Sequence, residues 1–211
     1  MKLAIDIQGI QSKDNFYRGI GRYSLSLINE LICHPFFDDI ILVANSNLPD
    51  IYYLFADVIK SEESKCNYFI HYFPERDSCR DLSDSEFNKL AVSFKTYTYS
   101  LLNVDLILIT SFFEGFNNEA IIEFDKEKYS LPPISSLIYD LIPFIHSSLY
   151  LDSNSIYKDF YLNRLSKIHI LDHIFTISNS ALEEIALNLN FNRKRIKNIS
   201  SACDKDLFIP K

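Results

Sequence analysis

Apolar residues follow two alternating patterns along the chain. Short runs rich in branched residues are typical of strands buried on both faces, whereas recurrence every three or four positions indicates one face of a helix. The expected strands occupy residues 2–8, 39–44, 67–73, 104–109, 134–139, 173–177 and 196–200. The expected helices occupy residues 21–32, 48–59, 83–102, 153–170 and 180–189. This alternation predicts an α/β fold, a Rossmann-like parallel sheet with helices on both faces.

Helix-breaking and capping residues mark several boundaries. Pro35 ends the first expected helix, and Pro49 falls near the first turn of the second. Ser83 and Glu86 form a Ser-x-x-Glu capping box before the third. We expect residues 9–17 to form a polar loop and residues 111–119 to form another. The pattern after residue 119 is compatible with either a short helix as far as residue 124 or a continued loop.

Length and composition exclude several classes of protein. The 211 residues suit one domain, and 47 % hydrophobic residues are ample for a core, so a disordered chain is not expected. The net charge of −7 and the scattered lysines and arginines argue against a nucleic-acid binder, which needs a basic face. The longest apolar runs are far shorter than the roughly 18 residues of a membrane helix.

The cysteines and the N-terminal residues bear on the cell compartment. The four cysteines, at positions 33, 66, 79 and 203, contain no Cys-x-x-Cys pair, and Met1 is not followed by a charged and then an apolar segment as in a signal peptide. We therefore expect reduced thiols in a cytoplasmic protein.

The stretch between the first expected strand and the first expected helix carries glycines and arginines. Gly19 and Gly21 precede a helix N-terminus, whose unpaired N–H groups and positive dipole favour phosphate, and Arg18 and Arg22 add positive charge. A plain helix start with surface arginines is the alternative. Ser24 stands where a Gly-x-Gly-x-x-Gly motif needs its third glycine, so a nicotinamide or flavin cofactor is not expected.

All four glycines of the chain follow strand-like runs, so each is expected in a loop at one end of the sheet, the end where open α/β sheets bind ligands. They are Gly9, Gly19, Gly21 and Gly115.

Two acidic residues stand in positions that suit a sugar ligand. Asp140 directly follows an expected strand, where a carboxylate either orients a sugar hydroxyl, holds a catalytic partner or caps a turn. Glu114 lies among phenylalanines in the segment 112–116. Aromatic faces with a carboxylate suit sugar binding, but such a loop also suits a core.

Metal-binding patterns are weak. His169 and His173 are four residues apart without a third ligand, and Asp204 with Asp206 forms an Asp-x-Asp pattern that suits either a divalent metal or a turn. No metal is expected, and the metal-dependent reading of the Asp-x-Asp pattern remains an alternative. The basic residues within 193–197 fit either anionic lipid or a solvated helix end.

Five motifs taken together resemble one family. Residues 5–12, 18–24, 113–116, 139–143 and 177–180 occur in the order and spacing of the N-terminal domain of family 4 glycosyltransferases, and are most similar to mannosyltransferases of bacterial polysaccharide and O-antigen synthesis. The resemblance implies that residues 1–211 form the acceptor-binding half of a GT-B enzyme. The C-terminal half, with its Glu-x7-Glu motif and nucleotide-sugar site, is expected to be absent from this chain.

The resemblance also implies roles for individual residues. Tyr139 and Asp140 would lie by the reacting sugar as catalytic residues. Residues of the donor-phosphate and acceptor loop would be Arg18, Gly19, Gly21 and Arg22. Acceptor-binding residues would be Glu114, Gly115, Ser178 and Asn179.

This chain departs from the family pattern at two of these positions. Many family members carry His where Tyr139 stands, so no imidazole role is transferred. Arg18 replaces the first glycine of the Gly-Gly often found in the loop.

The expected function is that of the acceptor side of a retaining hexosyltransferase. Such an enzyme moves a hexose, expected to be mannose, from a nucleotide-diphosphate sugar such as GDP-mannose to a growing bacterial surface glycan, without a cofactor or metal. Expected partners are the glycan acceptor and, through the second domain, the donor. The fragment alone is expected to be inactive, in the cytoplasm or on the inner face of its membrane. A non-catalytic glycan-binding module paired with a donor-binding subunit is the alternative.

Overall fold

A computed structural model describes residues 1–73 and 86–201 of the chain. The described residues form one seven-stranded sheet, ordered β3-β2-β1-β4-β5-β6-β7, in which all neighbouring strands run parallel. The strands are β1 (Lys2–Asp6), β2 (Asp39–Asn45), β3 (Cys66–His71), β4 (Leu106–Ile109), β5 (Ile134–Leu137), β6 (His173–Thr176) and β7 (Ile196–Asn198).

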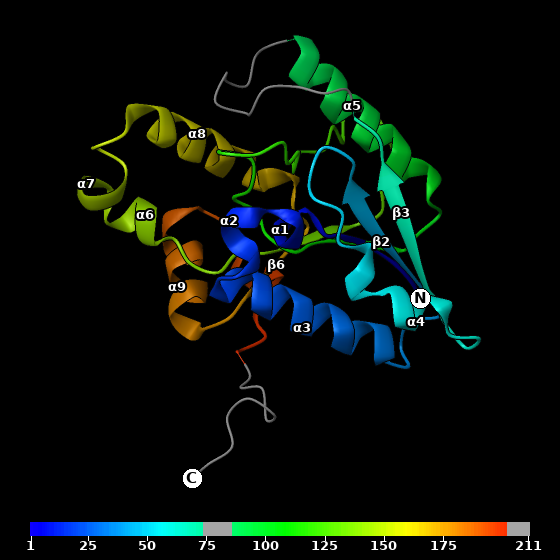
Figure 1. Cartoon of the computed structure of the whole chain (residues 1–211). Coiled ribbons are helices and arrows are strands. Elements are labelled where there is room, and N and C mark those ends of the chain that lie inside the picture. Colours follow the sequence, from blue (N-terminus) through cyan, green and yellow to red (C-terminus); the bar gives the residue numbers. More distant parts are fainter. Residues whose placement is uncertain (74–85, 202–211) are drawn as a thin grey trace.

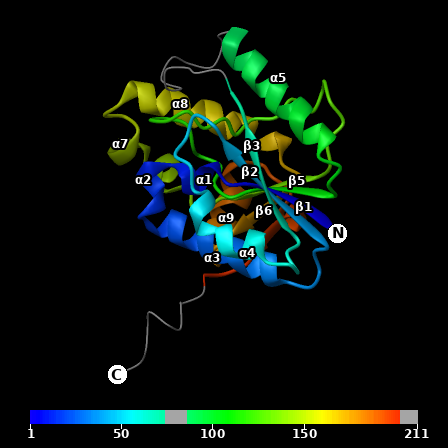
Figure 2. The same cartoon turned by 45° about the vertical axis from the view of Figure 1, so that its right-hand side comes forward.

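Helices flank this sheet on both sides, with α3 and α4 on one and α5 and α8 on the other (Figures 1 and 2). The α-helices are α1 (Gln8–Gln11), α2 (Lys13–Phe16), α3 (Gly19–Cys33), α4 (Ala56–Lys60), α5 (Glu86–Leu101), α6 (Ile142–Ile145), α7 (Ser147–Tyr150), α8 (Ser155–Ser166) and α9 (Asn179–Asn188). Short 3-10 helices are η1 (Tyr52–Leu54), η2 (Lys167–Ile170) and η3 (Arg193–Arg195).

The core consists of an apolar layer on each face of the sheet. Leu3 and Ile5 of β1 pack with Ile28 of α3, whereas the intervening Ala4 belongs to the layer that contains Tyr99 of α5. Successive side chains of a strand point to opposite faces of the sheet, so a central strand that is covered on both faces needs apolar residues at consecutive positions. The predicted Rossmann-like parallel sheet with helices on both faces is confirmed.

The order in which the chain adds strands to the sheet reverses between β1 and β4. From β1 the chain builds outward through β2 to the edge strand β3, and then returns to place β4 on the other side of β1. The segments that follow β1 and β4 therefore meet at the carboxyl edge, where ligands bind in sheets of this kind. Helices α1 and α2 follow β1 at this edge (Figures 1 and 2).

The sequence pattern missed the short elements. Residues 9–17 were expected to be a loop, but α1 and α2 occupy most of this segment, because a single buried turn such as α1 is too short to show helical periodicity. The expected helix 48–59 is divided between η1 and α4. Residues 111–124 contain no helix, and α6 and α7 follow β5 without having been expected. Ser83 of the expected capping box lies outside the described residues.

The prediction that every glycine lies in a loop is wrong for three of the four. Only Gly115 lies in a loop with a positive φ, of 105°. Gly9 and Gly21 lie inside α1 and α3, and Gly19 is the first residue of α3. No helix among the described residues has the length and hydropathy that crossing a membrane requires.

Candidate functional site

The N-terminus of α3 packs against the backbone of α2. A Cβ atom added to Gly21 would lie 2.4 Å from the carbonyl oxygen of Asn15 and 2.5 Å from that of Phe16. Glycine at this position therefore permits a close approach of two helices rather than an unusual backbone angle. By contrast, a Cβ at Gly19 would meet nothing within 4 Å.

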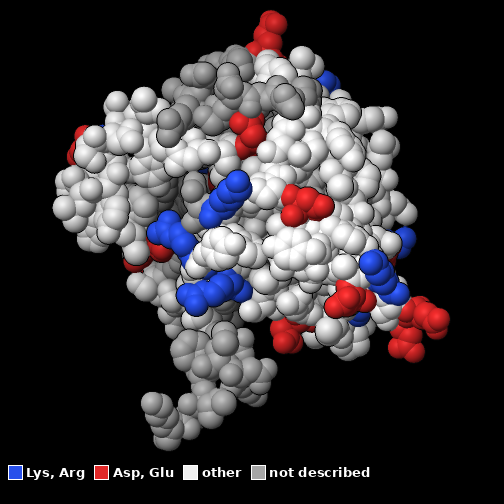
Figure 3. All heavy atoms as spheres, viewed as in Figure 1, with Lys and Arg blue, Asp and Glu red and all other residues white. Residues whose placement is uncertain are grey.

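Basic side chains surround this helix start. Arg18 is the N-cap residue of α3, and its side chain accepts no hydrogen bond from the first N–H groups of the helix. The exposed basic residues of the segment are Lys13, Arg18 and Arg22. Lys and Arg atoms gather beside a hollow on the face that carries α2 and the start of α3 (Figure 3). Neither Arg18 nor Arg22 forms an ion pair within the described part of the chain, and this arrangement suits an anionic ligand.

Glu114 joins the β4 loop to α2 from inside the protein. Its side chain is buried, and its Oε1 accepts hydrogen bonds from Asn15 Nδ2 at 2.5 Å and from Ser111 Oγ at 2.7 Å. Burial raises the pKa of Glu114 to about 7, although hydrogen bonds from Ser111, Asn15 and Ser12 and the charge of Arg164 oppose this shift. The geometry therefore gives Glu114 a positioning role for α2, not one of direct exposure to a ligand.

Tyr139 is similarly anchored at the start of α3. Its hydroxyl lies 2.8 Å from Ser24 Oγ and 3.3 Å from the carbonyl oxygens of Ile20 and Thr110. Burial raises the pKa of this phenol, so it stays protonated at neutral pH. Tyr139 connects β4, β5 and α3, and it holds the glycine-bearing helix start in place.

Asp140 points its carboxylate into a local turn near an aromatic cluster. Its Oδ1 accepts from the backbone N–H of Ile142 at 3.0 Å, which is the turn-capping geometry. It remains partly exposed. Burial is the main cause of the raised pKa values of Tyr157 and Tyr161 on α8, and the negative charge of Asp140 adds to it. Asp140 thus combines a structural hydrogen bond with an accessible acidic group.

The phenylalanines of the β4 loop pack on α8. Phe112 is buried, Phe113 stacks on Tyr161 with ring centroids 4.6 Å apart, and Phe116 contacts the ring of Tyr157. Core packing therefore explains most of this loop. The hydroxyl of the buried Tyr161 has no hydrogen-bond partner among the described residues.

Ser178 and Asn179 lie at the start of α9. Ser178 is its N-cap, and the Oγ atom accepts from the N–H of Ala181 at 3.1 Å. The Oδ1 atom of Asn179 accepts from Asn198 Nδ2 at 2.8 Å. These contacts account locally for both side chains, and none of them joins Glu114 or Tyr139.

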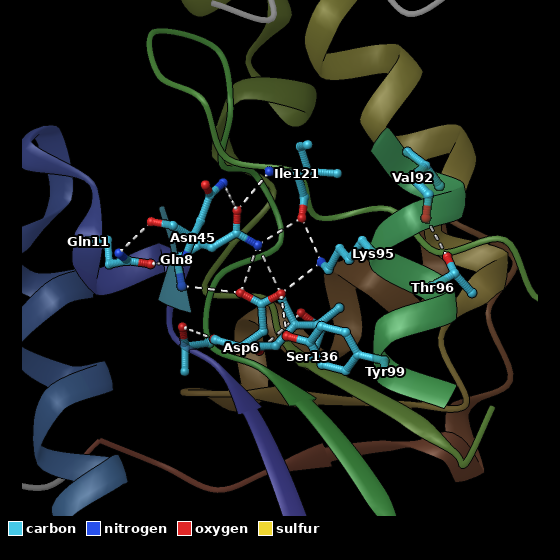
Figure 4. A network of polar contacts seen from close by, with 12 residues as sticks. Asp6, Gln8, Gln11, Asn45, Val92, Lys95, Thr96, Tyr99, Ile121 and Ser136 are labelled. Carbon is cyan, nitrogen blue, oxygen red and sulfur yellow. Dashed lines mark hydrogen bonds and ion pairs between the residues drawn. The ribbon is translucent and has the colours of Figure 1, made fainter. Parts of the chain in front are cut away.

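A buried polar network lies behind the site and was missed by the sequence pattern (Figure 4). The carboxylate of Asp6, at the end of β1, pairs with Lys95 Nζ of α5 at 2.7 Å and accepts from the Tyr99 hydroxyl at 3.2 Å. Lys95 also donates to the carbonyl oxygen of Ile121, and Gln8 bonds to both Asp6 and Ile121. An acid inside an otherwise apolar strand was the available signal for this network.

Arg164 of α8 is a second residue that the sequence pattern did not single out. It is buried, and it donates from Nη2 to the carbonyl oxygen of Glu114 at 3.0 Å and pairs with Glu123 at 3.3 Å. It thus fixes the backbone of the β4 loop beside Gly115. An arginine on the face of α8 that packs inward was the available signal for a buried role. Its partners, Glu114 and Glu123, are distant in sequence and could not be inferred from the pattern.

Within residues 1–73 and 86–201, no three His, Cys, Asp or Glu side chains gather in a way that would hold a metal ion. Asp204 and Asp206 lie outside the described residues. His169 donates from Nδ1–H to the carbonyl oxygen of Ser166 at 2.8 Å, as a helix-end histidine does.

We expect the stability of the protein to fall as pH rises through the pKa of Glu114. Because its folded pKa, about 7, lies above its ordinary value of 4.5, the stabilisation is complete below pH 4.5 and is lost as pH rises through 7. The loss is at most about 3 kcal/mol. Glu114→Gln keeps an acceptor for Asn15 and Ser111 but removes the titration.

Urea unfolding at pH 5 and pH 8 measures this effect. Between pH 5 and pH 8, the free energy of unfolding of wild type should fall relative to that of Glu114→Gln. Glu30→Gln, an exposed change on α3, is the control and should follow wild type at both pH values. Parallel pH profiles for wild type and Glu114→Gln would contradict the assignment.

The comparisons with known proteins agree with the motifs. No family profile matches the chain. The serotype-specific mannosyltransferase WbdA of Escherichia coli is 25 % identical over 214 residues, covering 99 % of this chain and 25 % of WbdA. A second WbdA sequence from E. coli is 24 % identical and covers 77 % of this chain and 19 % of its own length. The chain therefore spans a quarter or less of these relatives.

Among solved structures, Arabidopsis thaliana UGT89C1 complexed with quercetin superposes with a TM-score of 0.49 and 11 % identity, covering 94 % of this chain and 49 % of that one. The sequence comparison is the informative one, because it extends through all five motifs. The chain is homologous, over nearly its whole length, to part of the serotype-specific mannosyltransferase WbdA of E. coli, which confirms the resemblance to bacterial glycosyltransferases.

Proposed function

We propose that this chain is the acceptor-side, N-terminal domain of a retaining GT-B mannosyltransferase. The enzyme would transfer mannose from a nucleotide-diphosphate sugar such as GDP-mannose to a growing bacterial surface glycan. The observation that carries this proposal is the similarity to WbdA along 99 % of the chain. The nucleotide-sugar would be held chiefly by a second domain, and the reaction would need no metal.

The carboxyl edge of the sheet offers the electrostatics that such a transfer requires. In front-face transfer the donor phosphate oxygens accept the acceptor proton, and nearby positive groups stabilise the leaving nucleotide diphosphate. The uncapped N-terminus of α3 and the exposed guanidinium groups of Arg18 and Arg22 would supply that positive field. The hollow beside α2 leaves room for a charged ligand (Figure 3).

The remaining residues would divide between binding and positioning. Asp140, the accessible acid of the edge, would orient a hydroxyl of the reacting sugar. Tyr139 would act by holding Ile20 and Ser24, since its hydroxyl is already engaged there. Glu114 would shape the acceptor loop through Asn15 and Ser111. A location in the cytoplasm or on the inner face of the cytoplasmic membrane is part of the proposal.

Replacing Arg22 with Ala in the two-domain enzyme should lower the rate of mannose transfer by about tenfold to a hundredfold, as expected for loss of a group that stabilises developing charge. The measurement is transfer of radiolabelled mannose from GDP-mannose to a mannose oligosaccharide. Arg193→Ala is the matched control, because Arg193 precedes β7 at the opposite edge of the sheet and pairs with Glu183. Equal turnover of both variants would reject the role of Arg22.

A further inference from the structure

Helix α5 has apolar side chains on two faces. Ala91, Lys95 and Tyr99 face the core, and they are buried. On the outer side, four large side chains recur at spacings of four, three and four residues and are exposed by 68, 49, 46 and 63 %. They are Leu90, Phe94, Tyr97 and Leu101. This heptad-like spacing is the pattern by which one helix packs along another.

The neighbouring strand β3 extends the apolar surface. It is an edge strand of the sheet, so one side of its backbone has no partner strand within the described sheet. Phe69 is opposite Val43, which belongs to the core layer of α5, and the ring of Phe94 lies 5.0 Å from that of His71. Phe69 is itself exposed. We call this surface, made by Phe69, Leu90, Phe94, Tyr97 and Leu101, the α5–β3 surface.

None of the residues that make up the α5–β3 surface is charged, and one cation lies at its margin. Lys128 donates from Nζ to Ser93 Oγ of α5 and sits over the ring of Tyr129, which packs on Tyr97. From position 90 to position 101 the only charged residue of α5 is Lys95, which is buried against Asp6, and β3 contains no Asp, Glu, Lys or Arg. Edge strands that stay single are commonly protected by charged residues or proline, and β3 has neither. An apolar surface without such protection, with a single lysine at its margin, suits an apolar partner.

The size of the surface can be compared with that of a dimer interface. From the exposed fractions of its five side chains, it presents roughly 500 Å² of apolar area, since a fully buried aromatic side chain contributes about 150–250 Å². Each partner in a standard interface contributes about 800 Å². The five side chains therefore supply more than half of that area, and the polar rim with the unpaired backbone of β3 would supply the rest.

We propose that the α5–β3 surface binds a second copy of this chain across a two-fold axis. Strand β3 of one copy would pair antiparallel with β3 of the other, which would continue the sheet through the dimer. Because the same two-fold axis relates the two α5 helices, they would also pack antiparallel. Leu90 of one copy then lies against Leu101 of the other, and Phe94 lies against Tyr97.

Sedimentation equilibrium of the full 211-residue chain tests this proposal. Wild type should form a reversible dimer, and Leu90→Glu should raise its dissociation constant about thirtyfold or more, because the two-fold axis counts each substitution twice. Leu187→Glu on α9, a leucine that is 80 % exposed outside the surface, is the matched control and should dimerise like wild type. Circular dichroism spectra confirm that each variant is folded.

A charge-pair variant tests the antiparallel arrangement itself. Adding Leu101→Lys to Leu90→Glu should restore part of the dimer, since opposite charges would then meet at both ends of the helix pair. A chain that stays monomeric at its highest soluble concentration would overturn the proposal and assign the α5–β3 surface to another partner. A dimer that Leu90→Glu leaves unchanged would overturn it as well. Neither result bears on the proposed function, whose sugar site is proposed at the carboxyl edge of the sheet.

Discussion

Lys95→Met is expected to destabilise the protein by about 3–5 kcal/mol, the largest effect that we predict for a single substitution. The Lys95 ammonium and the Asp6 carboxylate are 1 % and 0 % exposed, so the substitution leaves a buried negative charge without its cation. The carbonyl oxygen of Ile121 also loses a donor. Urea unfolding followed by circular dichroism measures the free-energy change at neutral pH.

Two further variants separate charge from packing. Lys89→Met, an exposed change on the same helix, should alter stability by less than about 0.5 kcal/mol. Asp6→Asn combined with Lys95→Met should be more stable than Lys95→Met alone, because the side chain then carries no charge. Its single oxygen, placed where Oδ2 of Asp6 lies, can still accept from Gln8 Nε2 and from the Tyr99 hydroxyl. A single Lys95→Met variant within about 1 kcal/mol of wild type would show that the pair contributes little.

Gly21→Ala should cost about 3 kcal/mol of stability, because the new methyl group would meet backbone rather than a movable side chain. The backbone atoms in its way are the carbonyl oxygens of Asn15 and Phe16 and the Cα of Phe16, all within 2.6 Å of the point where the alanine Cβ would lie. Helix α2 must then shift, and the Asn15 contact with Glu114 shifts with it. We therefore expect lower stability together with weaker ligand binding at the carboxyl edge.

Gly19→Ala is the matched control for this change. It lies two residues away at the start of the same helix, in open space, and alanine favours helix more than glycine does. Its stability should equal that of wild type or exceed it by up to about 1 kcal/mol. If thermal unfolding finds the two alanine variants equally stable, the close approach of α2 and α3 does not constrain the fold.

The sheet and its long helices were predictable from sequence because buried strands and amphipathic helices impose periods on the chain. Runs such as residues 39–44 and 104–109 lie close to the observed β2 and β4. Short helices such as α1 and α7 show no such periodicity, because four residues make only about one turn. Contacts with residues distant in sequence hold such a turn in place. The side chain of Gln11 in α1, for example, bonds the backbone of Asn45.

The sequence predicted where the candidate site residues lie in the fold but not which residues their side chains contact. The motifs put Gly21, Glu114 and Tyr139 at the carboxyl edge, where the structure has them. Sequence spacing did not reveal that Glu114 is buried against Asn15 or that the Tyr139 hydroxyl is bound to the start of α3. Those facts depend on pairs separated by 99 and 119 positions, which only the folded chain brings together.

The central claim is that this chain binds the acceptor rather than the nucleotide-sugar. Saturation-transfer NMR of the 211-residue chain, with mannose oligosaccharides and separately with GDP-mannose, tests it most directly. We expect saturation transfer to the oligosaccharides, reduced by Asp140→Ala and unchanged by Arg193→Ala, with little transfer to GDP-mannose. Tight binding of GDP-mannose without binding of the oligosaccharides would contradict the acceptor-side assignment and make the loop around Gly21 a complete donor site.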